Sequence, residues 1–437
     1  MNFAQLGADS PAKRVLMVAF HFPPLAGSSG IQRTLRFVQH LPSLGWQPLV
    51  LSARACAYER TGADLLAEIP AGTVVCRAFA LDTARHLSLG GRYLHALARP
   101  DRWASWKWDA VRIGMQMIRH FRPQVLWSTY PVATAHVIGA ELQRRSGLPW
   151  VTDFRDPMAQ DGYPPDAATW RHYEAIEQTA AVQASGLTFT TPGALRCYRE
   201  RYPAAAERMA LLENGFDEGS FAAIEREHRV RAPLNPGAVT LLHSGVVYPQ
   251  ERDPTELFAA LRHLRRAGLP PGRMRLRFRA PAHEALLATL ARQYDVGDLI
   301  EVCPPIGYRA ALLEMLRADG LLVMQAANCN EQVPAKIYEY LRARRPVLCL
   351  ADPVGDTVAV LRAAGVGAFA RLDSASEIAA LLDRWLAGAC DREAMASPVA
   401  VQQASRLGRT EWLANHLDSV AFNAGRRALD VAAVSTA

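Results

Sequence analysis

The 437-residue chain is 50% hydrophobic and 21% charged, a balance that excludes an intrinsically disordered protein. Its length exceeds that of one ordinary hydrophobic core, so we expect two domains. The formal net charge of +7 is compatible with nucleic acid, phosphorylated ligands or anionic lipid, without choosing among them. The seven cysteines are scattered and form no C-x-x-C pair, which predicts reduced thiols in a cytoplasmic protein.

The first half of the chain has the alternation of a doubly wound α/β domain. A buried strand at 15–20 is followed by a small-residue loop at 27–30 and a helical pattern at 31–44. Further strands are predicted at 48–52, 73–80, 125–128, 150–153 and 187–190, and helices at 109–121, 133–146 and 169–184.

The pattern restarts after a segment rich in proline and glycine at 231–237, which has the composition of a linker. Strands are predicted at 240–243, 275–279, 300–302, 320–324, 347–350 and 368–370. We therefore expect an N-terminal domain over 1–230, a second domain over 237–400, and a closing helix and tail over 401–437 that could reach back to the first domain. Two such domains should face a cleft with the carboxyl ends of their strands.

The stretch from 329 to 350 carries the strongest indication of a ligand site. Pro334 suits the start of a helix that would run over 335–343, before the strand at 347–350. The N-terminus of a helix presents free N–H groups and the positive end of the dipole to a phosphate, and Lys336 would add a full charge there. Glu339, one turn further, is placed to bind a sugar hydroxyl, and Glu331 precedes it by eight positions. The pattern predicts a nucleotide-sugar site.

Two glycine loops follow predicted strands and could admit a phosphate or an acceptor group. The first comprises Gly27, Ser28, Ser29 and Gly30, and a plain connector is its alternative. The second is the turn at 244–245, where Gly245 is followed by Arg252, for which a solvated arginine is the alternative.

Asp156 follows a buried strand in the segment T-D-F-R-D-P, where a carboxylate should reach the edge of the sheet. It could orient an acceptor hydroxyl or act as a base. An ion pair with Arg155 or a helix cap explains it equally well.

The segment at 365–370 satisfies the dinucleotide pattern G-x-G-x-x-A. That fingerprint must follow a strand and open a helix, whereas here a helical segment precedes it and a strand follows. We therefore reject a nicotinamide cofactor and interpret Gly365 as a helix C-cap.

Tryptophans alternate with basic residues between 99 and 122. Trp103, Trp106 and Trp108 could lie at a membrane surface with the cations toward anionic lipid. A helix packed on its own domain is the slightly favoured alternative. The tryptophans could also stack on nucleic-acid bases, but no recognised nucleic-acid-binding module accompanies them.

Together, these segments resemble the retaining family-4 glycosyltransferases of the GT-B fold, and the resemblance covers about residues 14–420. The matching segments are F-H-F-P-P-L-A-G-S-S-G (20–30), T-D-F-R-D-P (152–157), E-N-G-F-D (213–217), H-S-G-V-V-Y-P (243–249) and E-Q-V-P-A-K-I-Y-E-Y-L (331–341). The last contains the family's pair of glutamates, although Gln332 and Val333 replace its usual glycines.

The resemblance implies two Rossmann-like domains and assigns roles to the predicted site. Residues 27–30 would border the donor phosphates and the acceptor, Arg252 and Lys336 would neutralise the leaving diphosphate, Glu339 would bind the ribose, and Glu331 would approach the transferred sugar. The acceptor-side residue is assigned to Asp156. No metal and no further cofactor are expected, because cations and a helix terminus would stabilise the leaving group.

We therefore interpret the sequence as a cytoplasmic hexosyltransferase that uses a UDP- or GDP-sugar with retention of configuration. Its acceptor would be a glycan or a lipid-linked precursor, with peripheral contact to the inner membrane face as an option and no nucleic-acid partner. The alternatives are a sugar-nucleotide epimerase of the same fold and a non-catalytic scaffold in a glycan-assembly complex.

Overall fold

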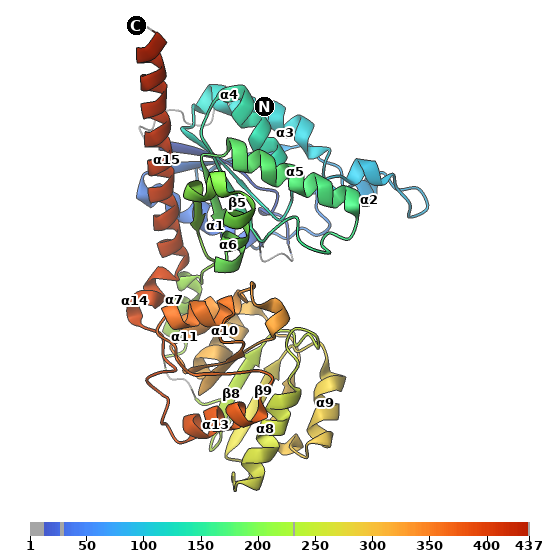
Figure 1. Ribbon diagram of the computed structural model, residues 1–437, viewed down its shortest axis with the longest axis vertical. Coiled ribbons are helices and arrows are strands. Elements are labelled where there is room, and N and C mark those ends of the chain that lie inside the picture. The colour runs from blue at the N-terminus through green and yellow to red at the C-terminus, as the bar shows by residue number, and fades with distance from the viewer. Residues whose placement is uncertain (1–12, 27–29, 230–231, 436–437) are drawn as a thin grey trace. The chain divides into compact units, whose positions relative to one another are not determined.

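The computed structural model describes residues 13–26, 30–229 and 232–435, with side chains described up to 426. The chain divides into two compact units (Figure 1). Unit 1 comprises Met1–Glu213 and Arg406–Ala437, and unit 2 comprises Asn214–Ser405. Each unit is built on its own parallel sheet.

Unit 1 contains a seven-stranded sheet in the order β3-β2-β1-β4-β5-β6-β7, and every pairing is parallel. The order reverses direction between β1 and β4, which is where open α/β sheets bind ligands at the carboxyl ends of their strands. The strands are β1 (Lys13–Val18), β2 (Trp46–Ala53), β3 (Val74–Ala78), β4 (Val125–Thr129), β5 (Trp150–Arg155), β6 (Gly186–Phe189) and β7 (Met209–Leu211).

Helices cover both faces of this sheet because its strands are apolar on both sides. The α-helices of unit 1 are α1 (Gly30–His40), α2 (Thr83–His86), α3 (Trp106–Phe121), α4 (Thr134–Ser146), α5 (Ala167–Gln183), α6 (Pro192–Arg201) and α15 (Arg406–Ser435). Short 3-10 helices are η2 (Leu41–Leu44), η3 (Ala55–Ala57), η4 (His95–Ala98) and η5 (Pro203–Arg208).

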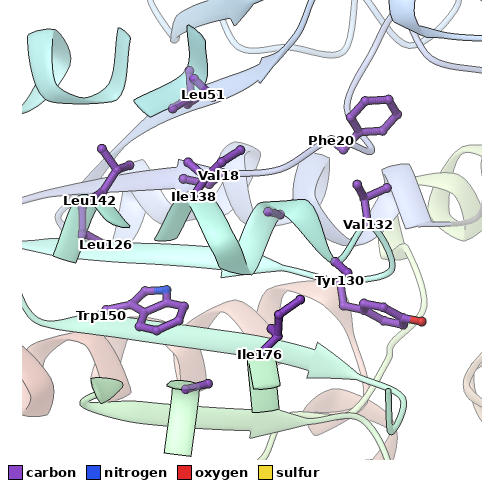
Figure 2. Close-up of a cluster of buried hydrophobic side chains, with 14 of the residues drawn as sticks. Val18, Phe20, Leu51, Leu126, Tyr130, Val132, Ile138, Leu142, Trp150 and Ile176 are labelled. Atoms are coloured by element: carbon purple, nitrogen blue, oxygen red, sulfur yellow. The ribbon is translucent and has the colours of Figure 1, made fainter. Parts of the chain in front are cut away.

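Successive residues of β1 enter different cores, as the two-residue period of a strand requires. Leu16 and Val18 belong to the cluster shared with α3, α4 and α5, part of which Figure 2 shows. Val15 and Met17 face the opposite side and pack with residues of α1 and α15. Gly139 of α4 lets the indole of Trp150 approach, because a Cβ there would lie 2.5 Å from the indole nitrogen.

Unit 2 contains a six-stranded parallel sheet in the order β10-β9-β8-β11-β12-β13. Its strands are β8 (Val239–Ser244), β9 (Met274–Arg279), β10 (Ile300–Cys303), β11 (Gly320–Gln325), β12 (Val347–Ala351) and β13 (Phe369–Ala370). The direction of the strand order reverses between β8 and β11, repeating the arrangement of unit 1.

The helices of unit 2 again form two layers around the sheet. One core contains residues of α8, α9 and α13, and the other contains residues of α7, α10, α11 and α12. The helices are α7 (Glu218–Glu227), α8 (Thr255–Arg266), α9 (Glu284–Gln293), α10 (Tyr308–Arg317), α11 (Lys336–Ala343), α12 (Asp356–Ala363), α13 (Ala375–Leu386) and α14 (Pro398–Gln403), with the 3-10 helices η6 (Gly297–Leu299) and η7 (Ala327–Cys329).

The α/β class and the two parallel sheets expected from the sequence are confirmed, but the units divide at different residues. The first unit ends at Glu213 rather than at 230, because α7 packs into unit 2. Arg342 of α11 pairs there with Glu218 and Glu225. The tail belongs to unit 1, where α15 packs beside α1.

Two further expectations concern local structure. Gly365 follows α12 and precedes β13, with φ +92° and its N–H donating to the Arg362 carbonyl, so the segment ends a helix and does not open one.

In the basic tryptophan segment, Trp106 is fully buried and Trp103 is packed against the core, whereas Trp108 is 76% exposed. No helix in the described part of the chain is long and apolar enough to cross a membrane.

Replacing Leu417 by alanine should destabilise unit 1. Leu417 is fully buried on α15, and truncating a buried leucine typically costs about 2–5 kcal/mol. Phe422→Ala provides a control on the same helix, because that ring is 65% exposed. Calorimetric melting of both variants checks the expectation. Equal melting behaviour would mean that α15 does not contribute to the stability of unit 1.

Candidate functional site

A buried ion pair joins α1 to β5 in unit 1. Arg33 and Asp153 have side chains that are 1% and 0% exposed, and their two bonds measure 2.7 and 2.9 Å. The hydroxyls of Thr129 and Thr188 donate to the same carboxylate at 2.7 and 3.1 Å. Although burial raises it, the Arg33 guanidinium holds the pKa of Asp153 below its ordinary value. The buried carboxylate is therefore charged and fully partnered.

The same guanidinium also fixes the end of the first segment of unit 1. Arg33 donates to the carbonyls of Leu212 and Glu213 at 2.8 and 3.0 Å. The carboxylate of Glu213 in turn pairs with Arg409 of α15 at 2.8 Å. Polar bonds thus link α1, β5, the segment after β7 and α15.

Gly30 begins α1 at a point where a larger residue would not fit. A Cβ there would lie 2.6 Å from His21 Nδ1 and 2.8 Å from Arg155 Nη1. Burial and the nearby Arg155 charge lower the pKa of His21 to about 4, so its ring is neutral near pH 7. Gly27, Ser28 and Ser29 lie outside the described residues, so their predicted phosphate contact stays a prediction.

Arg155 is a residue of this region for which the sequence suggested only an ion pair with Asp156. It occupies a register shift between β5 and β6 and has φ +63°, a conformation that non-glycine residues rarely adopt. Its guanidinium forms no hydrogen bond or ion pair within the described part of the chain. Strained residues of this kind are concentrated at functional sites, which makes Arg155 a candidate anion contact.

Asp156 lies beside this cluster and is exposed. It caps no helix, since the next helix, α5, is capped by Asp166. Within the described residues its carboxylate forms no ion pair with Arg155, although the Arg155 charge acts on it. Partial desolvation nonetheless raises the pKa of its carboxyl. Both structural alternatives for Asp156 are thus wrong, and its acceptor-side role stays a prediction.

In unit 2, Lys336 at the start of α11 reaches back to the end of β8. Its Nζ donates to the Ser244 carbonyl at 2.8 Å and lies 3.2 Å from His243 Nε2. The other nitrogen of His243 lies 3.0 Å from the Leu322 carbonyl, which can only accept, so Nε2 is left as the acceptor for Lys336. Burial and then the charge of Arg252 lower the pKa of Lys336 to about 7.

Arg252 supplies a second cation beside Lys336 and is not the solvated side chain of the plain alternative. Its Nη1 donates to the Val246 carbonyl at 2.9 Å, and its guanidinium lies 5.3 Å from the Tyr248 ring centroid. Its Nε is buried without a hydrogen-bond partner among the described residues. Gly245 has φ +120°, and a Cβ there would lie 3.2 Å from Lys336 Nζ, so glycine makes room for the lysine.

Glu339 lies one turn along α11 and is partly buried. Its carboxylate accepts a hydrogen bond of 3.0 Å from the hydroxyl of Tyr308, the first residue of α10. Tyr308 is 51% exposed and was missed in the sequence. Its position directly after Gly307, at the carboxyl end of β10, is the signal that could have identified it.

Glu331 lies in the turn between η7 and α11 and is exposed. It forms no hydrogen bond or ion pair with any residue that the structure describes, so no contact links it to Lys336. The helix itself begins at Lys336, and a bond from the Ile337 N–H to the Pro334 carbonyl adds a short turn before it. The predicted helix is therefore confirmed to within two residues.

These contacts make the start of α11 an anion-binding arrangement. Two cations, Lys336 and Arg252, lie at the N-terminus of α11, the positive end of the helix dipole, and within the described chain neither has a carboxylate ion-pair partner. A diphosphate would supply the missing negative charge. No group of three or more His, Cys, Asp or Glu residues in the described ranges is placed to hold a metal.

No family model matches this chain, and no curated protein matches it. Solved structures, however, share its fold over nearly its full length. Anabaena HepE in complex with UDP matches with a TM-score of 0.62 and 13% identity, covering 93% of this chain and 100% of that one. Sucrose-phosphate synthase from Thermosynechococcus elongatus matches with a TM-score of 0.55 and 13% identity, covering 97% of this chain and 100% of that one. The UDP-forming trehalose-phosphate synthase from Burkholderia xenovorans matches with a TM-score of 0.62 and 11% identity, covering 94% of this chain and 99% of that one. The chain has the GT-B fold.

Replacing Arg33 by methionine should strongly destabilise unit 1. Removal of one partner leaves the other buried charge unpaired, which typically costs about 3–5 kcal/mol. Arg112→Met is the matched control. The Arg112 side chain is 59% exposed in its ion pair with Asp109, so its loss should change the free energy of unfolding little. Denaturant unfolding of both variants checks this. Similar losses would contradict a special role for the buried pair.

Proposed function

We propose that this protein is a glycosyltransferase that transfers a hexose from a UDP- or GDP-sugar with retention of anomeric configuration. The observation that carries the proposal is the pair of cations, Lys336 and Arg252, at the N-terminus of α11 in a GT-B fold. Among the similar solved structures, HepE is recorded with UDP-glucose and with UDP.

The two cations would act on the leaving group. In the transfer step, the acceptor oxygen bonds to the anomeric carbon on the face from which the diphosphate departs, and the bond from that carbon to the phosphate oxygen breaks. The acceptor proton passes to the departing diphosphate oxygen. Lys336, Arg252 and the positive end of the α11 dipole would stabilise the negative charge that develops there. This electrostatic role supports a metal-independent reaction without a further cofactor.

Glu339 would bind the nucleotide ribose through its carboxylate. The hydrogen bond from Tyr308 holds one of its oxygens, which orients the group and leaves acceptor capacity for a ribose hydroxyl. The exposed ring of Tyr308 would pack on the nucleoside. Exposed Glu331 would approach the transferred sugar.

The acceptor side is assigned to unit 1. Asp156 would orient the acceptor hydroxyl, and the loop ending at Gly30 would admit the acceptor and border the donor phosphates. Arg155, whose guanidinium contacts the space beside Gly30, would attract an anionic group of donor or acceptor. The acceptor itself is proposed to be a glycan or a lipid-linked precursor, used in glycoconjugate synthesis on the cytoplasmic face of a membrane.

Substitution of the donor-site residues should weaken nucleotide binding while the fold survives. Lys336→Met and Arg252→Met each remove a charged contact worth about 1.5–3 kcal/mol, so UDP affinity should fall by about tenfold to a hundredfold. Glu339→Gln should weaken UDP binding as well. Calorimetric titration with UDP, after a thermal-shift screen of UDP- and GDP-sugars, measures these effects.

Two matched variants make that experiment specific. Arg309→Met removes an exposed cation of the same unit, paired with Glu227, and should leave UDP affinity unchanged. Glu331→Gln should keep UDP affinity but slow transfer of the sugar. Unchanged UDP affinity in both Lys336→Met and Glu339→Gln would overturn the donor-site assignment. Inversion at the anomeric carbon of the product, followed by NMR, would overturn retention.

Donor binding should weaken as the pH rises above neutrality. The free enzyme has a Lys336 pKa of about 7, and a bound diphosphate raises it because it favours the charged amine. Binding therefore takes up a proton above pH 7, and affinity falls by at most about tenfold per pH unit until the pKa of the complex is reached. Calorimetry in buffers of different ionisation enthalpy reports this uptake. In Lys336→Arg, UDP affinity should not depend on pH in this range. A pH dependence that persists in that variant would show that a group other than Lys336 takes up the proton.

A further inference from the structure

Unit 1 contains an apolar pocket that none of the proposed donor or acceptor residues line. It has a volume of about 640 Å³ and lies among α3, α4, α5 and the segment from Leu87 to Pro100. Its inner wall includes buried Trp150 and Ile176, both visible in Figure 2. This volume lies within the range of small-molecule sites.

Large apolar side chains remain exposed where this pocket opens. Leu87 and Leu97 are 43% and 48% exposed, and Trp108 is 76% exposed. Leu89 and Leu94, on the same segment after α2, are 91% and 73% exposed. Apolar side chains gathered around the opening of an apolar pocket indicate a surface that meets an apolar partner.

A second hollow of about 420 Å³ adjoins the first and is lined by a larger share of polar groups. The two share Lys107, Trp108 and Glu141 in their walls. Besides Trp108, Val111 and Met115, the second is lined by one carboxylate, Glu141, and by four cations, Lys107, Arg112, Arg119 and Arg145. Arg112 pairs with Asp109 and Arg145 with Glu141. Lys107 and Arg119 have no ion-pair partner among the residues described. Trp108 therefore stands between an apolar pocket and a cationic recess.

This juxtaposition fits the two halves of one ligand class. We propose that the apolar pocket takes an acyl chain of an anionic phospholipid and that the cationic recess binds its phosphate, which docks unit 1 on an anionic membrane. Tryptophan at such a boundary places its ring at headgroup level, and exposed leucines beside it enter the acyl region. Cations near the surface then add electrostatic attraction. Such a site would hold the protein at the membrane that carries its proposed lipid-linked acceptor. Only this biological purpose rests on the proposed function; the lipid contact itself does not.

Flotation of the full-length protein with vesicles tests the proposal. The protein should bind phosphatidylcholine vesicles that contain phosphatidylglycerol and should not bind phosphatidylcholine alone. Arg119→Glu and Leu97→Asp should each lower the bound fraction about fivefold or more, because each removes a favourable surface contact. Ala175→Trp, at an exposed position of the pocket wall, should fill the pocket and weaken binding to the same vesicles.

Controls separate a lipid site from general charge and from loss of fold. Arg171→Glu removes an exposed cation of α5 outside both hollows, and Phe422→Asp changes an exposed apolar residue of α15, so both should float as the wild type does. All variants should keep wild-type melting and UDP binding, which makes failure here distinguishable from failure of the donor site. Wild-type flotation of Ala175→Trp, equal loss in Arg171→Glu, no binding to anionic vesicles, or preferential binding to polyuridine would overturn the proposal.

Discussion

The buried pair of Arg33 and Asp153 is the interaction on which unit 1 depends. Desolvating two charges is costly, and the structure offsets that cost with two threonine hydroxyls and two backbone carbonyls, so that both groups are satisfied. These bonds fix the relation between α1 and β5. Gly30 precedes Arg33 by one turn and Arg155 follows Asp153 by two residues, so the pair also sets the position of the proposed acceptor-side groups.

Unit 2 handles charge in the opposite way. Lys336 and Arg252 lie close together with no carboxylate ion pair in the described chain, and burial lowers the pKa of Lys336 to about 7. The repulsion between these two cations destabilises the free site. A bound anion removes that repulsion, which adds to the free energy of binding. In the proposed donor site, this arrangement would strengthen the interaction with the leaving diphosphate as its negative charge develops.

The sequence predicted what depends on local periodicity and missed what depends on three-dimensional proximity. Apolar runs and glycine or proline stops identified both sheets and the helix after Pro334. The restart at 240 was visible, but α7 was assigned to the wrong side, because its affiliation rests on Arg342 contacts with Glu218 and Glu225 more than a hundred positions away. The sequence suggested Arg155 only as an ion-pair partner of Asp156, because its significance comes from a positive φ and from its proximity to Gly30, neither of which a linear pattern reveals.

The chain enters unit 2 after Glu213 and returns to unit 1 at Arg406, so unit 2 is an insertion within unit 1. The sheet face that carries Val15 and Met17 needs Leu413 and Leu417 of α15 for its cover. A ribosome delivers those leucines only after the whole of unit 2 has been made. During synthesis, unit 2 can therefore fold as a continuous segment while one apolar face of unit 1 stays exposed to solvent until α15 is made, a condition that favours chaperone binding.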